Sequence, residues 1–286
     1  MTPSRDARTT VVIATRDRAG ELARTLRRLL ALRPRPPIVV VDNASTDDTA
    51  EDVLATRPDP AAVRLLRLPD NAGAAARNVG VVAADTPYVA FSDDDSWWAP
   101  GALPRAADAL DRHPRIGLVA ARTLVGPGER PDPVDELLAG SPLGTEPGLP
   151  GPSVLGFLAC SAVVRRSAFD EVGGFSPLLH FGAEETLLAY DLAAAGWVSC
   201  YLAEVRAHHH PAARRMAPAR RARLERRNHA LISWLRRPPA YCVRSAAGLL
   251  RDPVAAAGAL RRLPRALAGR SPLPSDVERK VRVLEG

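Results

Sequence analysis

The sequence predicts an α/β fold with a mostly parallel sheet that is flanked by helices. In the first 125 residues, short β-branched and aliphatic runs alternate with stretches whose apolar residues recur at helical spacing. The runs at Ile38–Val41 and Tyr88–Ser92 are short and largely apolar, which is typical of parallel strands that are covered on both faces.

The first half of the chain reads as strand and helix in turn. After a strand at Thr9–Ala14, leucines at helical spacing indicate a helix at Glu21–Leu32, and the proline-rich segment that follows breaks it. The next expected elements are Ile38–Val41, a helix from Asp47 or Asp48 to Thr56, Val63–Leu68, a small-residue helix at Asn71–Gly80, Tyr88–Ser92, Ala102–Arg112 and Ile116–Leu124.

The second half is less regular. Gly126–Pro152 is rich in Pro and Gly without clear periodicity, and we expect a long loop, which in a compact domain is usually functional or mobile. The elements expected beyond it are a strand at Gly156–Val164, a helical turn at Phe169–Phe175, a helix at Ala183–Ala195, a strand from Trp197 to Val205, and helices at Arg220–Arg237, Tyr241–Leu250, Val254–Ala268 and Ser275–Leu284.

Length and composition bound the class of protein. The chain has 286 residues, 46% of them hydrophobic, which suffices for one large α/β domain and an appendage. No apolar run reaches the roughly 18 residues of a membrane span, and Met1–Arg8 has no apolar signal-peptide core, so we expect a cytoplasmic protein. Three scattered cysteines fit neither a disulfide framework nor a zinc site.

The net charge of +7 is unevenly distributed. Arg206–Arg270 contains 16 arginines and two acidic residues, a net +14, which leaves −7 for the remainder. The basicity therefore belongs mainly to a C-terminal extension at 213–286 and not to the predicted catalytic part at 1–212. The acidic character of the catalytic part argues against a nucleic-acid partner.

Two interpretations of the basic extension remain open. Its arginines can form a solvated helix face packed on the catalytic part, which is the usual role of a charge run. Alternatively, arginines interleaved with Leu231, Ile232 and Trp234 can contact an anionic lipid surface, which would make the protein peripheral at the inner face of a membrane.

Three carboxylates, Asp93, Asp94 and Asp95, follow the strand Tyr88–Ser92 directly. They repel one another unless a cation neutralises them, and Mg²⁺ or Mn²⁺ prefers carboxylate oxygens completed by substrate phosphates. Ligands of open α/β sheets bind at the carboxyl ends of the strands. The triplet therefore predicts a metal–diphosphate site, and the alternative is a solvated acidic turn that caps the next helix.

Taken together, the polar segments that follow the predicted strands resemble those of the family 2 glycosyltransferases, which have the GT-A fold, a Rossmann-like architecture. The resemblance covers about residues 9–210 and implies a nucleotide-sugar half at about 9–125 and an acceptor half at about 153–212. The matching segments are TTVVIATRDR (9–18), VVVDNASTDDT (39–49), NAGAAARNVG (71–80), FSDDD (91–95), EVGGF (171–175) and GAEETLLAYDLAAAGW (182–197).

The resemblance implies a nucleotide pocket built from the ends of the first strands. Asp42 would contact the base or the ribose of the donor, and Thr15 and Arg16 would line the same pocket. Arg77 would reach the base or the diphosphate. The base of the nucleotide is left open.

The resemblance also implies a metal site. Asp93 and Asp95 bracket the family's DXD pattern, with Asp95 on the Mn²⁺ or Mg²⁺ and Asp93 towards the ribose, the sugar or the metal. Asp94 would contact the sugar. His208 or His210 would complete the metal shell, with His208 preferred because it lies nearest the last strand, and the alternative for these histidines is an exposed polar turn.

On the acceptor side, the family's Glu-Asp pair is replaced by Glu184-Glu185, and Leu187 stands where a second acid is usual. Glu185, or else Glu184, would deprotonate the acceptor hydroxyl as it attacks the sugar. Gly174 would shape a turn near the acceptor. One of Trp97 and Trp98, here assigned to Trp98, would stack on a sugar. The alternative is that these tryptophans anchor the core.

The sequence thus predicts a metal-dependent inverting glycosyltransferase. It would move a sugar from a nucleoside diphosphate sugar to a hydroxyl of a glycan, a lipid-linked glycan or a small molecule, as in cell wall or polysaccharide biosynthesis. One alternative is a non-catalytic sugar-nucleotide binder or scaffold, which the Glu184-Glu185 departure favours. Another is a sugar nucleotidyltransferase, which would require a glycine-rich phosphate loop after the first strand.

Overall fold

The computed structural model describes residues 8–56, 62–212 and 216–286. Its strands are β1 (Thr9–Thr15), β2 (Ile38–Asp42), β3 (Val63–Arg67), β4 (Tyr88–Ser92), β5 (Ser96–Trp98), β6 (Ile116–Val125), β7 (Arg130–Pro131), β8 (Ala162–Arg165) and β9 (Val198–His209). Its α-helices are α1 (Ala19–Leu30), α2 (Thr49–Thr56), α3 (Ala76–Val82), α4 (Ala102–Arg112), α5 (Pro133–Ala139), α6 (Arg166–Glu171), α7 (Glu184–Ala194), α8 (Pro218–Arg236), α9 (Pro239–Leu249), α10 (Pro253–Leu260), α11 (Leu263–Ala268) and α12 (Ser275–Glu285). Two 3-10 helices are η1 (Gly73–Ala75) and η2 (Ala159–Ser161).

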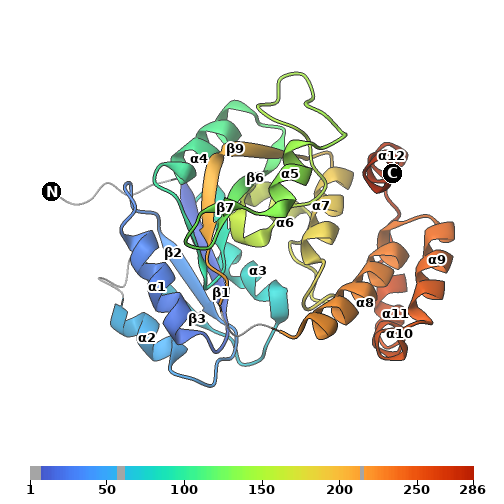
Figure 1. The fold of residues 1–286 in the computed structure, drawn as a ribbon, viewed down its shortest axis with the longest axis horizontal. Helices are drawn as coiled ribbons and strands as arrows, with labels where there is room; N and C mark the ends of the chain where they lie inside the picture. Colours follow the sequence, from blue (N-terminus) through green and yellow to red (C-terminus); the bar gives the residue numbers. More distant parts are fainter. Residues whose placement is uncertain (1–7, 57–61, 213–215) are drawn as a thin grey trace.

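The strands form one sheet in the order β3-β2-β1-β4-β8-β6-β9-β5, and β7 pairs with β6. Strands β1 to β4, β6 and β9 run in one direction, whereas β8 and β5 run in the other. The sheet curls through the centre of the molecule with helices around it (Figure 1). The predicted α/β class with a mostly parallel sheet is confirmed.

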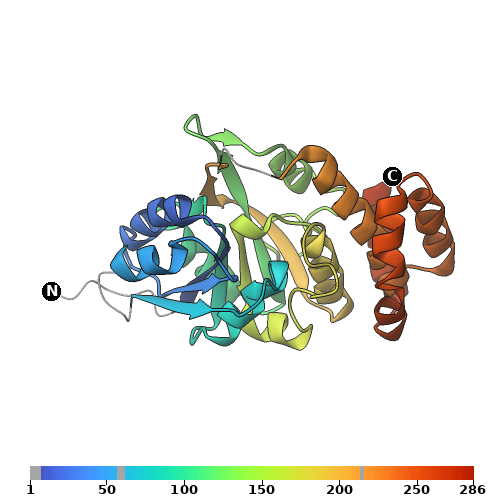
Figure 2. The same cartoon turned by 90° about the horizontal axis from the view of Figure 1, so that it is seen from below.

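Each face of the sheet is covered by its own helices. Val11 and Ile13 of β1 join one core cluster with α1 and α4, while Val12 joins a second cluster with α3, α6 and α7. This division follows from the alternation of side chains along a strand. It explains why the central strands are apolar throughout. Figure 2 shows the arrangement of the helices around the sheet from below.

The carboxyl ends of three neighbouring strands meet at one edge of this sheet. β1 lies between β2 and β4 and is parallel to both, with Thr15 in register with Asp42 and Ile13 in register with Ser92. The polar residues that follow β1, β2 and β4 are therefore brought together, as expected for a ligand site of an open α/β sheet.

The prediction of an irregular loop at Gly126–Pro152 is wrong in part, because β7 and α5 lie within it. The side chain of Asp132 accepts a hydrogen bond from the Val134 N–H and so caps α5, whose first turn contains a proline. Buried Asp135 accepts a hydrogen bond from the Thr123 N–H on β6 and ties the segment to the sheet.

Other boundaries also differ from the prediction. The expected strand at Gly156–Val164 is η2 followed by β8, α6 begins at Arg166 and not at Phe169, and β9 continues to His209. The expected helix at Val254–Ala268 is two helices, because Pro264 lies in the first turn of α11 and suits the start of a new helix. Strand β5, three residues long, is too short to show a periodic pattern.

The C-terminal helices α8 to α12 form a lobe beside α7 (Figure 1). Leu231, Ile232 and Trp234 of α8 are buried in a cluster that also contains Leu179 and Leu187 from the preceding part of the chain. The expectation that these three side chains contact lipid is therefore wrong. Helix α8 buries its apolar residues against α9, α10 and α11 as well as against Leu179 and Leu187, which fits the alternative of a helix packed on the preceding part of the chain.

Membrane-spanning helices are not found among the described residues, since none of their helices combines sufficient length with sufficient hydropathy.

Helix α3 lies unusually close to the sheet. A Cβ atom added to Gly80 would lie 2.4 Å from Val12 Cγ1 and 3.2 Å from Val41 Cγ2. We therefore expect Gly80→Ala to lower the free energy of unfolding by about 1–3 kcal/mol through overpacking, as measured by urea denaturation.

The matched control is Gly20→Ala in α1, where an added Cβ has no atom within 4 Å. This change is expected to be neutral or to stabilise the protein by up to about 1 kcal/mol, because alanine favours the helix. A Gly80→Ala protein as stable as the wild type would contradict the close packing of α3.

Candidate active site

A cluster of acidic and basic side chains occupies the edge of the sheet where β1, β2 and β4 end. Asp42, at the end of β2, is only 1% exposed. Its Oδ1 accepts a hydrogen bond from the Ser45 N–H at 2.9 Å, and its Oδ2 lies 3.4 Å from Arg67 Nε. The carboxylate is thus held in place at the floor of the predicted nucleotide pocket.

Asn43 connects this floor to the next segment, a role that the sequence did not reveal. Its Oδ1 accepts a hydrogen bond from the Ala72 N–H, and its Nδ2 donates to the Gly73 carbonyl. Arg16 Nη1 donates to the Asn43 carbonyl at 3.2 Å. An asparagine after a strand indicates a turn. The sequence does not indicate that this asparagine bonds to Gly73, thirty residues later.

The three carboxylates after β4 have different surroundings. Asp93 forms an ion pair with Arg77, whose Nη2 lies 2.5 Å from Asp93 Oδ1. Asp94 accepts a hydrogen bond from Thr15 Oγ1 at 3.1 Å. Burial and the neighbouring charges of Asp93 and Asp95 raise the pKa of Asp94 to about 7. This mutual repulsion is what a bound cation would relieve.

Asp95 is the carboxylate nearest to a histidine. Its Oδ2 accepts a hydrogen bond from the Ala212 N–H at 2.9 Å, and its Oδ1 lies 3.4 Å from His209 Nε2. Burial acts to raise the pKa of Asp95, but the contacts with His209 and Ala212 outweigh it, so the pKa lies below its usual value. Asp95 therefore carries a charge at neutral pH.

The neighbouring histidines His208 and His210 lie against Trp97 instead. The His208 ring stacks on Trp97 with centroids 5.5 Å apart, and the His210 ring is tilted at 4.6 Å. His208 Nδ1 also lies 3.4 Å from Glu129 Oε1. His210 touches Asp95 through its backbone N–H. The structure thus brings the imidazole of His209, and not that of the predicted His208 or His210, to the predicted metal-binding carboxylate.

Glu184 and Glu185 begin α7 and lie near the same cluster. Glu184 is buried, and its Oε2 has no hydrogen-bond partner among the described residues. Burial and the charge of Glu184 raise the pKa of Glu185 to about 8, and burial also raises the pKa of Glu184. A carboxyl group with such a pKa is mostly protonated at pH 7 and is half-ionised near pH 8, where its ionised form can accept a proton.

Arg77 connects the two acidic groups. Its side chain is 11% exposed. Burial opposes the charge of Arg77, but the attraction of Asp93, Glu184 and Glu185 outweighs burial and raises its pKa. Its guanidinium also lies over the Phe175 ring, with 5.6 Å to the centroid.

The predicted acceptor-side residues occupy different environments. Trp98 is 0% exposed and belongs to a core cluster, as its alternative role of core anchor requires. Gly174 has a φ of +69°, and an added Cβ would lie 2.8 Å from Asn78 Oδ1. Asn78 in turn exchanges hydrogen bonds with the Phe175 backbone, next to Arg77 in the chain.

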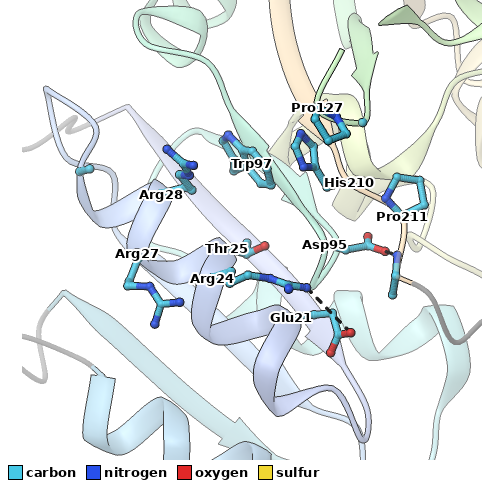
Figure 3. Close-up of a pocket in the computed structure, with 13 residues that line it drawn as sticks. Glu21, Arg24, Thr25, Arg27, Arg28, Asp95, Trp97, Pro127, His210 and Pro211 are labelled. Carbon is cyan, nitrogen blue, oxygen red and sulfur yellow. Dashed lines mark hydrogen bonds and ion pairs between the residues drawn. The ribbon is translucent and has the colours of Figure 1, made fainter. Parts of the chain in front are cut away.

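A cavity of about 820 Å³ lies beside Asp95 (Figure 3). One wall is the face of α1 with Arg24 and Arg28, and the opposite wall includes Trp97 and His210. Guanidinium groups bind phosphate and carboxylate well, and the volume is in the range of ligand pockets, about 300–1,000 Å³. The cavity can therefore hold an anionic ligand next to Asp95.

The fit of this edge to a divalent cation can be judged from its ligands. Within residues 8–56, 62–212 and 216–286, no three His, Cys, Asp or Glu side chains form a metal site by themselves. Asp95 and His209 supply two groups, and Mg²⁺ and related ions often take only one or two carboxylates and complete their shell with water and substrate phosphates. The residues fit a cation that is shared with a diphosphate.

Comparison with known sequences places these residues in a family. The model described as Glycosyl transferase family 2 matches residues 10–173. The pre-mycofactocin glycosyltransferase of Mycobacterium tuberculosis is 35% identical over 196 residues, which are 65% of this chain and 39% of that protein. The N-acetylglucosaminyl-diphospho-decaprenol L-rhamnosyltransferase of the same organism is 30% identical over 237 residues, 71% of this chain and 76% of that protein.

Solved structures share the fold at lower identity. The mannosyltransferase PcManGT from Pyrobaculum calidifontis, in complex with GDP-Man and Mn²⁺, aligns with a TM-score of 0.60 and 24% identity over 94% of this chain and 78% of that chain. S. aureus TarS 1–349 in complex with UDP-GlcNAc aligns with a TM-score of 0.60 and 14% identity over 91% and 90% of the two chains. The likeness establishes a shared GT-A fold.

The raised pKa of Glu185 predicts a loss of stability as the pH rises. Between the ordinary glutamate value and about pH 8, the folded protein keeps a proton on Glu185 that the unfolded chain has released. We expect Glu185→Gln, which cannot ionise, to have a higher Tm than the wild type at pH 8.5 and the same Tm at pH 4, as measured by circular dichroism.

Glu136→Gln, at an exposed glutamate of α5, is the control and is expected to leave the pH dependence of Tm unchanged. Equal Tm values for Glu185→Gln and the wild type at both pH values would show that Glu185 ionises normally in the folded protein.

Proposed function

The chain belongs to glycosyl transferase family 2, and we propose that it is a metal-dependent, inverting glycosyltransferase. It moves a sugar from a nucleoside diphosphate sugar to a hydroxyl of a glycan, a lipid-linked glycan or a small molecule. The observation that carries the proposal is the placement of Arg77 between Asp93 on the donor side and the Glu184-Glu185 pair on the acceptor side.

The donor site is built from strand ends. Thr15, Arg16 and Asp42 would line the pocket for the nucleotide, and Arg77 would reach its diphosphate. The register of β1 with β2, which brings Thr15 and Asp42 together, supports this. Asp94, held by Thr15, faces the sugar. A Mn²⁺ or Mg²⁺ ion held by Asp95 and His209 together with the diphosphate would neutralise the leaving group.

The acceptor side supplies the base. Glu185 has a pKa of about 8 and therefore exchanges a proton near the working pH. It takes the proton of the acceptor hydroxyl as that oxygen forms its bond to the anomeric carbon and the bond to the diphosphate breaks. Burial raises the pKa of Glu185 most, and the charge of Glu184 raises it further, because a second negative charge nearby opposes ionisation.

Relatives narrow the class of acceptor. One relative is a pre-mycofactocin glycosyltransferase, and another is an N-acetylglucosaminyl-diphospho-decaprenol L-rhamnosyltransferase. The second name describes a lipid-linked sugar, which is one of the acceptor classes proposed here. The alternative of a non-catalytic scaffold is based on the presence of Glu185 where the family usually has an aspartate. The raised pKa of the Glu185 carboxyl supports a catalytic role instead.

We also propose that 213–286 brings the enzyme to an anionic membrane from the cytoplasmic side, through the outer face of α9, α10 and α11. The only acidic residue of 239–270 is Asp252, which is 8% exposed and forms an ion pair with Arg226. The segment 239–270 therefore combines arginines with exposed apolar side chains and offers no exposed carboxylate, which suits an anionic lipid surface. The exposed large apolar residues of this segment are Val243, Leu250, Val254, Leu260 and Leu267.

Donor binding tests the metal site. We expect calorimetry to detect binding of one of UDP, GDP and dTDP that strengthens about tenfold or more with Mn²⁺, and we expect Asp95→Asn to lose the metal effect because its side chain is neutral. Asp48→Asn, at an exposed aspartate before α2, is the control. Equal binding with and without Mn²⁺ would contradict the metal-dependent donor site.

Turnover tests the base. With the nucleotide sugar selected by binding, we expect Glu185→Gln to slow release of the nucleoside diphosphate by about 10²–10⁴-fold, the usual contribution of a general base, while the Kd of the nucleotide changes little. The alternative base, Glu184→Gln, is measured beside it. Full activity in both variants would assign the proton transfer elsewhere.

Vesicle binding tests the membrane face. We expect the protein to sediment with phosphatidylglycerol vesicles and not with phosphatidylcholine vesicles. Replacing Leu250 and Val254 together by Ser should weaken binding about tenfold or more, since partial insertion of each side chain contributes about 1 kcal/mol. Leu137→Ser, at an exposed leucine of α5, should have no effect. Equal binding of both variants would rule out this face.

A further inference from the structure

The segment 179–183 carries the chain into α7 and thereby places Glu184 and Glu185. Three of its residues have left-handed backbone conformations, His180 (φ 64°), Gly182 (φ 90°) and Ala183 (φ 60°). Outside glycine, such conformations are unfavourable and persist only when the surroundings hold them. The position of the two glutamates therefore depends on whatever contacts this segment.

The contact comes from α8 in the C-terminal extension. Asn228 is 0% exposed. Its Nδ2 lies within hydrogen-bond distance of three carbonyls of the segment, 3.1 Å from that of Leu179, 2.9 Å from Phe181 and 2.5 Å from Gly182. The amide has two hydrogens, so one of them is shared between two of these carbonyls.

The neighbouring Arg227 fixes the amide itself. Arg227 Nε donates to Asn228 Oδ1 at 2.9 Å, and Arg227 Nη2 donates to the Leu179 carbonyl at 2.7 Å. Because the guanidinium can only donate, it holds the amide oxygen towards itself and turns the amide NH₂ towards the segment. The pair therefore has one orientation.

The far side of the segment lies against the donor half. The Ala74 N–H donates to the His180 carbonyl at 2.7 Å, and a Cβ on Gly73 would overlap that carbonyl. The Gly73 carbonyl in turn accepts a hydrogen bond from Asn43, beside the nucleotide pocket. The segment is thus clamped between α8 and η1, with the glutamates at its exit.

We propose that Asn228, oriented by Arg227, is a positioning residue for proton transfer, so that the extension completes the active site. Asn228 is fully buried and therefore acts through the turn rather than on a substrate. It holds the 179–183 turn, and the turn sets where the Glu185 carboxyl meets the acceptor hydroxyl. The inference rests on the proposed glycosyl transfer in one respect, namely that proton transfer to Glu185 is the step affected by the 179–183 turn.

The test uses the full chain with Asn228→Leu, which keeps the volume and removes the donors. With the sugar nucleotide that binds, we expect kcat of donor hydrolysis to fall about tenfold or more, within the range that a general base contributes, while KM and the nucleotide Kd change less than about twofold. Asn228→Gln retains the amide and should recover part of kcat. If Asn228→Leu does not fold, Arg227→Gln, which removes the orienting guanidinium, replaces it.

The matched control is Arg226→Ala, one residue away in α8, which removes the ion pair with Asp252 but no contact to the turn. Its kcat should equal that of the wild type even if its Tm is lower. Wild-type kcat in Asn228→Leu, or an equal loss of kcat in Arg226→Ala, would overturn the proposal.

A second measurement does not depend on turnover. Hydrogen exchange followed by mass spectrometry should show faster exchange of the backbone amides of 180–187 in Asn228→Leu and not in Arg226→Ala. If the wild type turns over no sugar nucleotide, the proposed function fails, and the exchange result still decides whether Asn228 holds the turn. Unchanged exchange there would overturn the positioning role by itself.

Discussion

A buried guanidinium, that of Arg77, keeps carboxylates from two halves of the molecule within one small space. The nearest of them, Asp93, follows β4, while Glu184 and Glu185 begin α7 almost a hundred residues later. Without a cation between them, their like charges would repel strongly in a region with little water. The guanidinium thus offsets part of the repulsion at the acidic edge, while burial and the charge of Glu184 keep the pKa of Glu185 raised.

The sequence predicted the site residues best where polar side chains directly follow a strand or begin a helix. The end of β2 at Asp42, the acids after β4 and the glutamates that open α7 all follow a local pattern, and a parallel sheet necessarily gathers strand ends at one edge. The pattern failed where the deciding partner is distant. His208, His209 and His210 are equivalent in the sequence, and only the pairing of β5 with β9 decides which of them meets Asp95.

The basic extension shows the same limit. Its excess of arginine suggested a solvated or lipid-facing surface, but several arginines are used internally. Arg237 forms ion pairs with Glu278 and Glu285, and Arg236 pairs with Asp191 of α7. The core of this lobe also incorporates leucines from the 179–187 region. The composition shows that the extension is basic. How the helices of the extension pack against the rest of the protein depends on tertiary contacts, which cannot be predicted from the spacing of apolar residues.

Gly80 affects the position of Arg77 as well as the packing of α3. It lies one turn after Arg77 on α3, and its missing side chain lets the helix rest on Val12 and Val41. The distance of the helix from the sheet in turn sets how far the Arg77 guanidinium extends over the acidic edge. Position 80 therefore belongs to the electrostatics of the site although it touches no ligand. A larger residue at position 80 would therefore shift Arg77 relative to the acidic edge, in addition to loosening the packing of α3 on the sheet.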